Sequence, residues 1–461
     1  MPHHIIIGGG PAATNAIESI RQFESDKSQI TLICDEPAHS RMALPYWLAG
    51  QIPREQTYTA DAAHFQKLGV DARIGRRVAK IDPAANTVTL DDGSELAFDN
   101  LLIATGAAPV APPIPGADLS GVQPMWSLAH MELALKTVDG MKQPRAVLVG
   151  AGFIGFIVLN AMYKRGWKLT VVERESQVLP RMLDAAAAGT VQHWLGQRGV
   201  DLHTGTTAAS IIETGDGAKR LELANGTTVE ADLVILATGI QPNTGLVDGS
   251  GIETDAGILV NDRMQTNFPN IYAGGDVAQG PVLFGGKQEI HAIQPTAVDH
   301  GRVAGANMAG HEVHYPGSLL MNVVDVCGLQ TASFGHWNDA AAEDFTIQND
   351  RDFIYRKLLW TGDQLTGAIF AGRSTDLGML TDVGMVKGII QTQSSLAEWK
   401  DYLRENPFDI RRAYIGAGVA QKLVGATLTG RPSQARGFHF GGAEPKTQKT
   451  DAHSVYVGTK P

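Results

Sequence analysis

The sequence predicts an α/β protein in which two domains share one plan and a third, α+β domain follows them. A short β-branched run, a glycine-rich turn and a helical pattern occur together twice, first at Gly8 and again at Gly150. After each turn the same features follow in the same order: an acidic residue ending the next apolar run, a hairpin pattern and an Ala-Thr-Gly turn. We therefore expect two Rossmann-like domains that bind dinucleotides.

The first glycine-rich turn follows the apolar run 5–7, which we expect to be a buried strand. In the G-x-G-x-x-A spacing the first glycine permits the sharp bend, the second lets a pyrophosphate approach the backbone, and the small third residue lets the helix pack closely. The free N–H groups of the helix N-terminus attract phosphate. Such turns also occur for purely structural reasons. The prediction of a dinucleotide site therefore rests on the second occurrence of the same pattern in the chain. The predicted binding residues are Gly8, Gly10, Pro11, Ala12 and Ala13.

The second apolar run, 29–34, ends at Asp35 and Glu36, where a carboxylate would hold ribose hydroxyls. A solvated acidic turn is the alternative interpretation. Residues 78–98 predict a small antiparallel meander, and its first residue, Val78, is assigned to the cofactor site. A buried strand at 101–103 then ends in a small-residue turn, which adds Ala104, Thr105 and Gly106 to that site. Prolines gather between residues 109 and 115 and predict a stiff linker.

The second copy begins with the apolar run 146–149 and a full G-x-G-x-x-G turn. Its next strand, 169–172, ends at Glu173. A carboxylate there accepts a hydrogen bond from a ribose 2′-hydroxyl and repels a 2′-phosphate, which favours NADH over NADPH, although Arg174 beside it would soften the preference. Asn225-Gly226 predicts a hairpin turn. The predicted binding residues of this copy are Gly150, Gly152, Phe153, Ile154, Gly155, Glu173 and Gly239.

After the second copy, the chain is expected to return to the first domain. Residues 266–276 predict a short strand that ends in two glycines and Asp276. The glycines would let the backbone approach a ligand, so Gly275 joins the cofactor-binding residues, and Asp276 can hydrogen-bond a polyol chain. The segment 294–309 has helical spacing, and the N-terminus of such a helix would stabilise negative charge on a bound cofactor.

Composition and charge exclude several classes of function. The 461 residues include 48 acidic and 38 basic side chains, and a net charge of −10 argues against nucleic acid or an anionic membrane as a partner. No apolar run reaches the ~18 residues of a membrane span, and the first strand begins too early for a signal peptide. Cys34 and Cys327 alone cannot build a disulfide framework or a thiolate metal site, and we expect no metal. We expect a cytoplasmic protein.

Taken together, the ordered motifs resemble those of the FAD-containing pyridine nucleotide–disulfide oxidoreductase superfamily. The resemblance covers residues 3–320 and rests on Gly8-Gly9-Gly10-Pro11, Ala104-Thr105-Gly106, Gly150–Gly155, Ala237-Thr238-Gly239 and Tyr272–Asp276. It implies that the first site holds FAD, that the second holds NADH, and that Asp276 bonds the ribityl chain. The flavin would then lie at the junction of the two domains, where hydride passes from the nicotinamide to the flavin.

One departure from the family pattern bears on how electrons leave the flavin. Disulfide and persulfide reductases of the coenzyme A type, and NADH oxidases, resemble this chain at Leu44-Pro45-Tyr46 but carry a cysteine two residues before that leucine. Here Met42 stands there, and a thioether is no thiolate nucleophile. We expect Cys34 and Cys327 to be buried fillers of strands. The chain is therefore more similar to the thiol-free branch, which includes redoxin reductases and the flavin module of NADH-dependent nitrite reductase.

The same resemblance implies roles around the flavin. Arg41 would approach the flavin edge and stabilise negative charge there, whereas an arginine paired with Asp35 or Glu36 at the surface is the alternative. With Met42 and Pro45 it makes up the predicted catalytic residues. Many relatives carry a glutamate two residues after the last glycine of the second turn, but this chain has Ile157, which makes the nicotinamide site less secure than the FAD site.

We expect an FAD-binding domain at 1–112 and 241–314, an NAD(H)-binding domain at 113–240, a C-terminal interface domain at 315–425 and an extended tail at 426–461. The predicted function is an FAD enzyme that moves hydride from NADH to FAD and then electrons to a small redox carrier, a small-molecule acceptor or a partner subunit, without a redox-active cysteine. It would be a homodimer or a subunit of a redox complex. The alternatives are a persulfide or coenzyme A disulfide reductase, an NADH oxidase, and a flavoprotein with a structural or sensory role in a complex.

Overall fold

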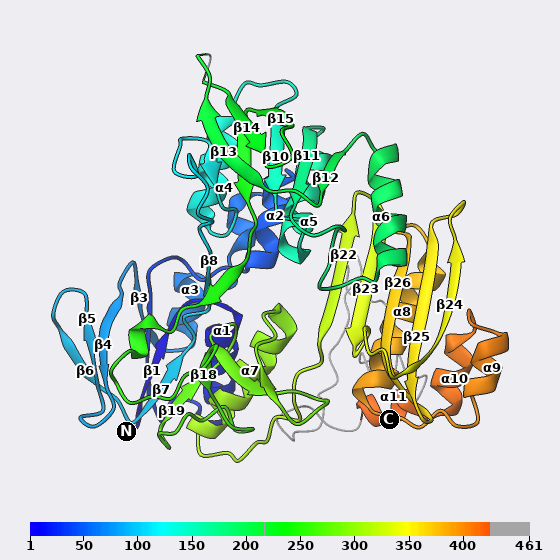
Figure 1. Ribbon diagram of the computed structural model, residues 1–461. Coiled ribbons are helices and arrows are strands. Elements are labelled where there is room, and N and C mark those ends of the chain that lie inside the picture. The colour runs from blue at the N-terminus through cyan, green and yellow to red at the C-terminus, as the bar shows by residue number, and fades with distance from the viewer. Residues whose placement is uncertain (216, 425–461) are drawn as a thin grey trace, which may run out of the picture.

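The computed structural model describes residues 1–215 and 217–424, and it shows three five-stranded sheets within them (Figure 1). Each sheet belongs to one of the three predicted regions of the chain. The expected extended tail lies outside the described residues. The predicted α/β class is thus confirmed, and the domain limits stay predictions.

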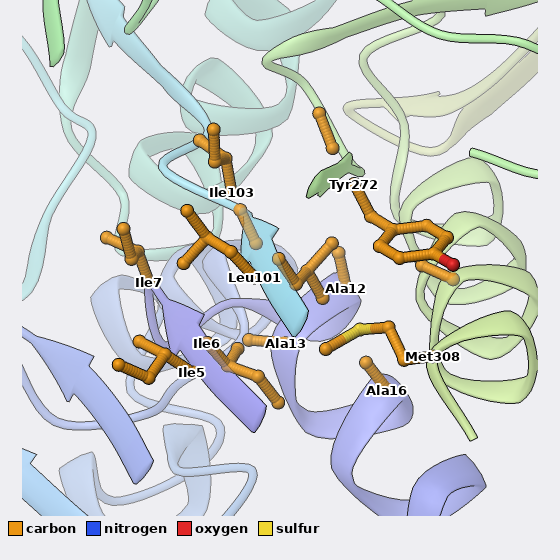
Figure 2. Packing of buried hydrophobic residues seen from close by; sticks show 14 of the residues in the cluster. Ile5, Ile6, Ile7, Ala12, Ala13, Ala16, Leu101, Ile103, Tyr272 and Met308 are labelled. Atoms are coloured by element: carbon orange, nitrogen blue, oxygen red, sulfur yellow. The ribbon is translucent and has the colours of Figure 1, made fainter. Parts of the chain in front are cut away.

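The first sheet is entirely parallel and is covered by α1 (Pro11–Glu24) and α7 (Gln294–Met308). The Ile5–Ile7 run is almost wholly buried, and Figure 2 shows it packed with Leu101, Ile103 and the small residues of α1. The chain returns to this sheet after the second domain, as expected. The strands, in spatial order, are β19 (Ile271–Ala273), β7 (Asn100–Ile103), β1 (His3–Ile7), β2 (Gln29–Cys34) and β3 (Val70–Ile74).

Small residues let α1 and α7 touch along their backbones. A Cβ atom at Gly301 of α7 would lie 2.2 Å from the carbonyl oxygen of Ala12, and one at Gly305 would lie 2.5 Å from that of Ala16. Because such distances are impossible for a larger residue, the axis of α7 is fixed against the helix of the first glycine-rich turn. This packing sets where the N-terminus of α7 points.

The second sheet repeats the first. It is also parallel, and the strand before its glycine-rich turn again lies between the Ala-Thr-Gly strand and the strand that ends in an acidic residue. The predicted duplication is therefore a duplication of topology. Its strands, in spatial order, are β12 (Asp201–Thr204), β11 (Lys168–Glu173), β10 (Arg145–Val149), β16 (Leu233–Leu236) and β9 (Val122–Gln123), with helices α4 (Leu128–Thr137), α5 (Phe153–Lys164) and α6 (Ala185–Gln197).

Smaller elements complete the two domains. The expected meander of the first domain is present, and the hairpin predicted at Asn225-Gly226 joins two strands of the corresponding meander in the second. The elements are α2 (Leu44–Leu48), α3 (Ala62–Lys67), β4 (Val78–Asp82), β5 (Thr87–Leu90), β6 (Glu95–Ala97), β13 (Ala208–Glu213), β14 (Lys219–Leu223), β15 (Thr228–Ala231), β18 (Ile258–Leu259), β20 (Ala278–Pro281) and β21 (Gln288–Glu289).

The two chain crossings between these domains form a ribbon. Strands β8 (Ala107–Pro109) and β17 (Ile240–Pro242) pair antiparallel, and the amide of Val110 also donates to the carbonyl of Gly239. The expectation of a proline-stiffened linker was incomplete, because Pro109 belongs to a paired strand. Proline tolerates such a two-stranded edge position, where its missing N–H breaks no central ladder.

The C-terminal region folds into an antiparallel sheet with helices on one side (Figure 1). Strands β25 and β26 form a hairpin, and helix α8 follows them in the chain. Cys327 was expected inside a strand, but it lies in the turn after β22 with a φ of +53°. The elements are β22 (Met321–Val326), β23 (Leu329–Gly335), β26 (Gln364–Arg373), β25 (Ile354–Thr361), β24 (Glu343–Asn349), α8 (Leu377–Gln391), α9 (Lys400–Glu405), α10 (Ile410–Gly416) and α11 (Val419–Val424).

Helix α6 of the second domain is bonded to this C-terminal sheet. Asp184 caps the helix through one carboxylate oxygen, and its other oxygen accepts hydrogen bonds from the Tyr355 hydroxyl at 2.7 Å and the Lys357 ammonium at 3.2 Å. Farther along the helix, the Trp194 indole donates to the carbonyl of Cys327 at 3.1 Å. The second and third units are therefore joined by buried and half-buried polar contacts.

Candidate cofactor cleft

A cleft of about 1640 Å³, open to solvent, runs along the first glycine-rich turn and ends against α5 and β22. It takes in residues from all three regions of the chain. Sixteen of the predicted site residues line it: Gly8, Gly10, Pro11, Ala12, Asp35, Glu36, Arg41, Met42, Pro45, Ala104, Thr105, Gly106, Phe153, Ile154, Gly275 and Asp276.

The first two glycines of this turn have different physical roles. Gly8 has a φ of +110°, and a Cβ there would lie 2.1 Å from the carbonyl oxygen of Ala104. Gly10 has an extended backbone that any residue adopts, and no heavy atom lies within 4 Å of the place of its Cβ. Gly8 is thus required by the fold, whereas the space at Gly10 faces the cleft. A bare backbone at the start of α1 fits the pyrophosphate of a dinucleotide.

The second glycine-rich turn repeats this geometry outside the cleft. Gly150 has a φ of +102°, and its Cβ would lie 2.4 Å from the carbonyl oxygen of Ala237, while the space at Gly152 is open. Gly155 allows close packing, because its Cβ would lie 2.7 Å from the carbonyl oxygen of Gly150. The helix that follows reaches the first cleft through Phe153 and Ile154. Two dinucleotide sites therefore meet at the start of α5.

Glu173, the residue predicted to bind a ribose, holds the second glycine-rich turn in place. Its carboxylate is buried and accepts hydrogen bonds from the amides of Ala151 at 2.5 Å and Glu175 at 2.8 Å. The first amide belongs to the glycine-rich turn itself. The acidic residue at the end of β11 is thus positioned before any ligand arrives.

We expect Glu173→Gln to lower the preference for NADH over NADPH about tenfold, or ~1.4 kcal/mol, because the variant loses the charge that repels a 2′-phosphate. The ratio of kcat/KM for the two nucleotides measures the effect. Glu222→Gln is a matched control, since it removes an equal charge from an exposed position on β14 of the same domain. An unchanged ratio in Glu173→Gln would contradict the role given to Glu173.

The other predicted residues do not reach the first cleft. Ala13 lies on the buried face of α1, where its small side chain permits close packing. Val78 packs against the core of the first domain from β4, and Gly239 is the last residue of the Ala-Thr-Gly turn of the second domain. The structure does not bring Val78 to the cleft lining, so its assignment to the cofactor site stays a prediction.

Arg41 lies near Glu36, as in the alternative interpretation, and its predicted approach to a flavin stays a prediction. It lies on the cleft wall, and one guanidinium nitrogen is 3.5 Å from a carboxylate oxygen of Glu36. Its guanidinium also stacks on the Trp126 ring at 4.9 Å, and the Trp126 indole donates to the carbonyl of Ala107 at 2.9 Å. The guanidinium of Arg41 therefore lies on the cleft wall between Glu36 of the first region and Trp126 of the second.

Asp276 and the N-terminus of α7 place charges of opposite sign on the cleft wall. Asp276 lines the cleft and has no hydrogen-bond partner among the described residues; burial raises the pKa of its carboxyl group, and Arg41 opposes that effect. The first turn of α7 also lines the cleft, and the Ser40 hydroxyl donates to the Gln294 side chain there at 2.7 Å. An acceptor for polyol hydroxyls thus lies beside a positive helix end, which suits the ribityl chain and the electron-rich ring of a flavin.

No thiol in the described residues lines the cleft. Met42 stands at the position discussed above, with 41 % of its surface exposed. Cys34 and Cys327 are both buried, and burial raises the pKa of each thiol to about 12. A buried protonated thiol is a poor nucleophile. In the part of the chain that the structure describes, no His, Cys, Asp and Glu side chains gather into a metal site either.

Apolar side chains close the cleft where the second site meets the first. Ile157 lines it beside Phe153 and Ile154. Sequence reasoning missed several other residues here because they come from segments without a motif: Met125, Trp126, Met131, Met321 and Val323. No sequence pattern predicts these residues, because only tertiary packing brings α4, the segment before it and the first residues of β22 to this wall.

Residues 2–301 match the family model described as pyridine nucleotide-disulphide oxidoreductase. The chain belongs to this family. It is 31% identical over 415 residues, 89% of the chain and 96% of the relative, to the NADH-dependent phenylglyoxylate dehydrogenase subunit epsilon of Aromatoleum evansii. It is also 30% identical to the nitrite reductase [NAD(P)H] of Bacillus subtilis. That match covers 81% of this chain and 46% of the length of the nitrite reductase.

A solved structure of an enzyme with similar sequence has the same fold. A NAD-dependent persulfide reductase from A. fulgidus superimposes with a TM-score of 0.78 at 29% identity, covering 86% of this chain and 78% of that one. The protein is accordingly an FAD-dependent NAD(P)H oxidoreductase, and the fold and cofactors expected from the sequence are confirmed. Among the described helices, none is long and apolar enough to cross a membrane.

Proposed function

We propose that this flavoenzyme exchanges electrons between NADH and a ferredoxin-type iron–sulfur carrier or an iron–sulfur partner subunit, without a redox-active thiol. The observation that carries the proposal is the chemistry of the cleft wall, where Met42 stands in place of a cysteine and neither of the two buried cysteines is part of the lining. The balanced reaction is NADH plus two oxidised one-electron carriers giving NAD⁺, two reduced carriers and one proton.

The residues of the cleft support this reaction. When bound, FAD supplies the two-electron to one-electron conversion that no side chain can perform. Arg41 and the N-terminus of α7 would stabilise negative charge on a bound flavin, and Asp276 would accept hydrogen bonds from its polyol chain. Ile157 and its apolar neighbours exclude water from the meeting point of the two sites.

The relatives favour a carrier or subunit as the acceptor. The relative that this chain matches over 96% of its length is named as a subunit of a larger dehydrogenase, and the nitrite reductase is a longer protein of which the matched part is less than half. We therefore keep a role as a redox subunit as the second candidate for the same chemistry. The proposed C-terminal interface domain would contact the partner or a second copy. The homodimer and the cytoplasmic location stay predictions.

An anaerobic comparison of acceptors tests the proposal. With NADH as donor, we expect rapid reduction of a [2Fe–2S] ferredoxin and no thiol release from coenzyme A disulfide. The double variant Cys34→Ala/Cys327→Ala serves as the control and should reduce ferredoxin at the wild-type rate, because neither thiol reaches the cleft. Cleavage of coenzyme A disulfide that disappears in the double variant would favour the persulfide or disulfide reductase alternative instead.

A further inference from the structure

Strand β24 forms an exposed edge of the C-terminal sheet. It pairs with β25 on one side, and no strand in the described part of the chain pairs with its other side (Figure 1). Proteins commonly protect such an edge with proline, lysine, a bulge or a covering element. The seven residues of β24 include neither proline nor lysine, and their register with β25 is continuous. At the opposite edge of the sheet, β22 packs against α5. The backbone of β24 is therefore open to a further strand.

The sequence of β24 is complementary to itself when two copies run antiparallel. It reads Glu-Asp-Phe-Thr-Ile-Gln-Asn, so a two-fold axis at its central residue, Thr346, places each acid opposite an amide. The opposed pairs are Glu343 with Asn349, Asp344 with Gln348, and Phe345 with Ile347. No like charges face one another in this register, and an amide N–H can donate to each carboxylate.

The charges on β24 allow this pairing. Lys400 and Arg404 of α9 both form ion pairs with Glu343. The Glu343 residues of two antiparallel copies would also stand at opposite ends of the pair, about 20 Å apart, which exceeds the screening length of physiological salt. The Gln348 amide donates one N–H to Asp350 at 2.7 Å, and its second N–H remains for a partner. Electrostatic repulsion therefore does not protect this edge.

Apolar side chains border the same edge. Phe345 and Ile347 are half-buried and line a small hollow together with Pro407. Phe408 is 54 % exposed, and the centre of its ring lies 4.4 Å from the guanidinium carbon of Arg356, the residue that pairs with Ile347 on β25. A strand added to β24 would lie beside these side chains. Apolar burial would thus add to the backbone hydrogen bonds of the pairing.

We propose that two copies of this chain associate through β24, antiparallel about a two-fold axis at Thr346, and so join their C-terminal sheets into one continuous sheet. This pairing gives the predicted homodimer a specific surface, and it does not depend on the electron acceptor of the proposed function. A strand of seven residues with few side chains around it makes a small interface. We therefore expect a weak dimer, with a Kd on the order of micromolar.

Charge substitutions at the centre of the strand test the pairing, because Thr346 faces its own copy there. Sedimentation velocity of the wild-type holoenzyme between about 1 and 100 μM should show a monomer–dimer equilibrium. Thr346→Lys and Thr346→Glu should each raise the Kd about tenfold or more, since like charges then oppose each other. The effect should be larger for lysine, because Lys357 pairs with Thr346 on β25. An equimolar mixture of the two variants should recover wild-type affinity, since opposite charges then face each other.

Controls separate the pairing from general effects of charge. Thr381→Lys places the same charge at an exposed position on α8 and should leave the Kd unchanged. The flavin content of each variant shows whether it has folded, and amide hydrogen exchange in wild-type β24 should slow as the concentration rises. A protein that stays monomeric up to about 100 μM, or a dimer whose Kd neither Thr346 variant changes, would overturn the proposal. A dimer of this kind that reduces no carrier would count against the proposed function alone.

Discussion

Replacing Gly10 with valine is expected to abolish FAD retention while leaving the fold intact. The backbone of Gly10 is extended, and a Cβ atom there would have no protein atom within 4 Å. The same side chain would occupy the space through which a pyrophosphate reaches the N-terminus of α1. Losing two charge-assisted hydrogen bonds to phosphate costs about 3 kcal/mol, or roughly 100-fold in Kd. The flavin absorbance of the purified protein and titration of the apoprotein measure the loss.

Gly8→Ala is the contrasting variant for this prediction. The Cβ of an alanine there would lie 2.1 Å from a backbone oxygen at a φ of +110°, so we expect the domain itself to lose roughly 2–4 kcal/mol of unfolding free energy. Thermal unfolding of the two apoproteins should therefore separate them. A Gly10→Val protein that is purified with a full complement of FAD would refute the assignment of the first turn.

Replacing Gly152 with valine is expected to spare FAD and disable NADH. Its backbone is also extended and its Cβ position also open, but it lies in the second glycine-rich turn. The variant should be purified with flavin at the wild-type ratio, and the concentration of NADH needed to half-saturate flavin reduction should rise about 100-fold by the same loss of phosphate contacts. Anaerobic titration of the flavin band with NADH measures this.

A chemical reductant completes that experiment. Dithionite should bleach the flavin of Gly152→Val and of the wild type alike, because it needs no nucleotide site. Loss of FAD from the Gly152→Val protein, or unchanged saturation with NADH, would mean that the two turns do not serve separate dinucleotides as the repeat indicates.

The repeated motifs predicted most of the fold because their residues are fixed by local geometry. Gly8 and Gly150 each touch the carbonyl of an Ala-Thr-Gly turn, so the order of the motifs along the chain reflects a contact made twice. Sheet order follows from the same pattern, since each glycine-rich strand lies between its two predicted neighbours. Strand and turn patterns of this kind depend on neighbouring residues in the sequence, so contacts with distant segments do not override them.

The remainder of the site could not be predicted because it depends on contacts between distant segments. Trp126 reaches Arg41 from the second region, and Val323 reaches the cleft from the third, and neither stands in a motif. The hydrogen bond from the glycine-rich turn to Glu173 is likewise visible only in three dimensions. Pro109 was assigned to a linker because its pairing partner, Ile240, lies far along the chain, after the whole second domain.

The most direct test of a thiol-free path from NADH to FAD is anaerobic stopped-flow of the double variant Cys34→Ala/Cys327→Ala mixed with NADH. Bleaching of the oxidised flavin band at the wild-type rate, with slower bleaching by NADPH, is the expected result. A wild-type protein that bleaches while the double variant does not would show that a thiol takes part. Failure of both to bleach with NADH would show that the apolar wall around Ile157 does not admit the nicotinamide, and would contradict the account.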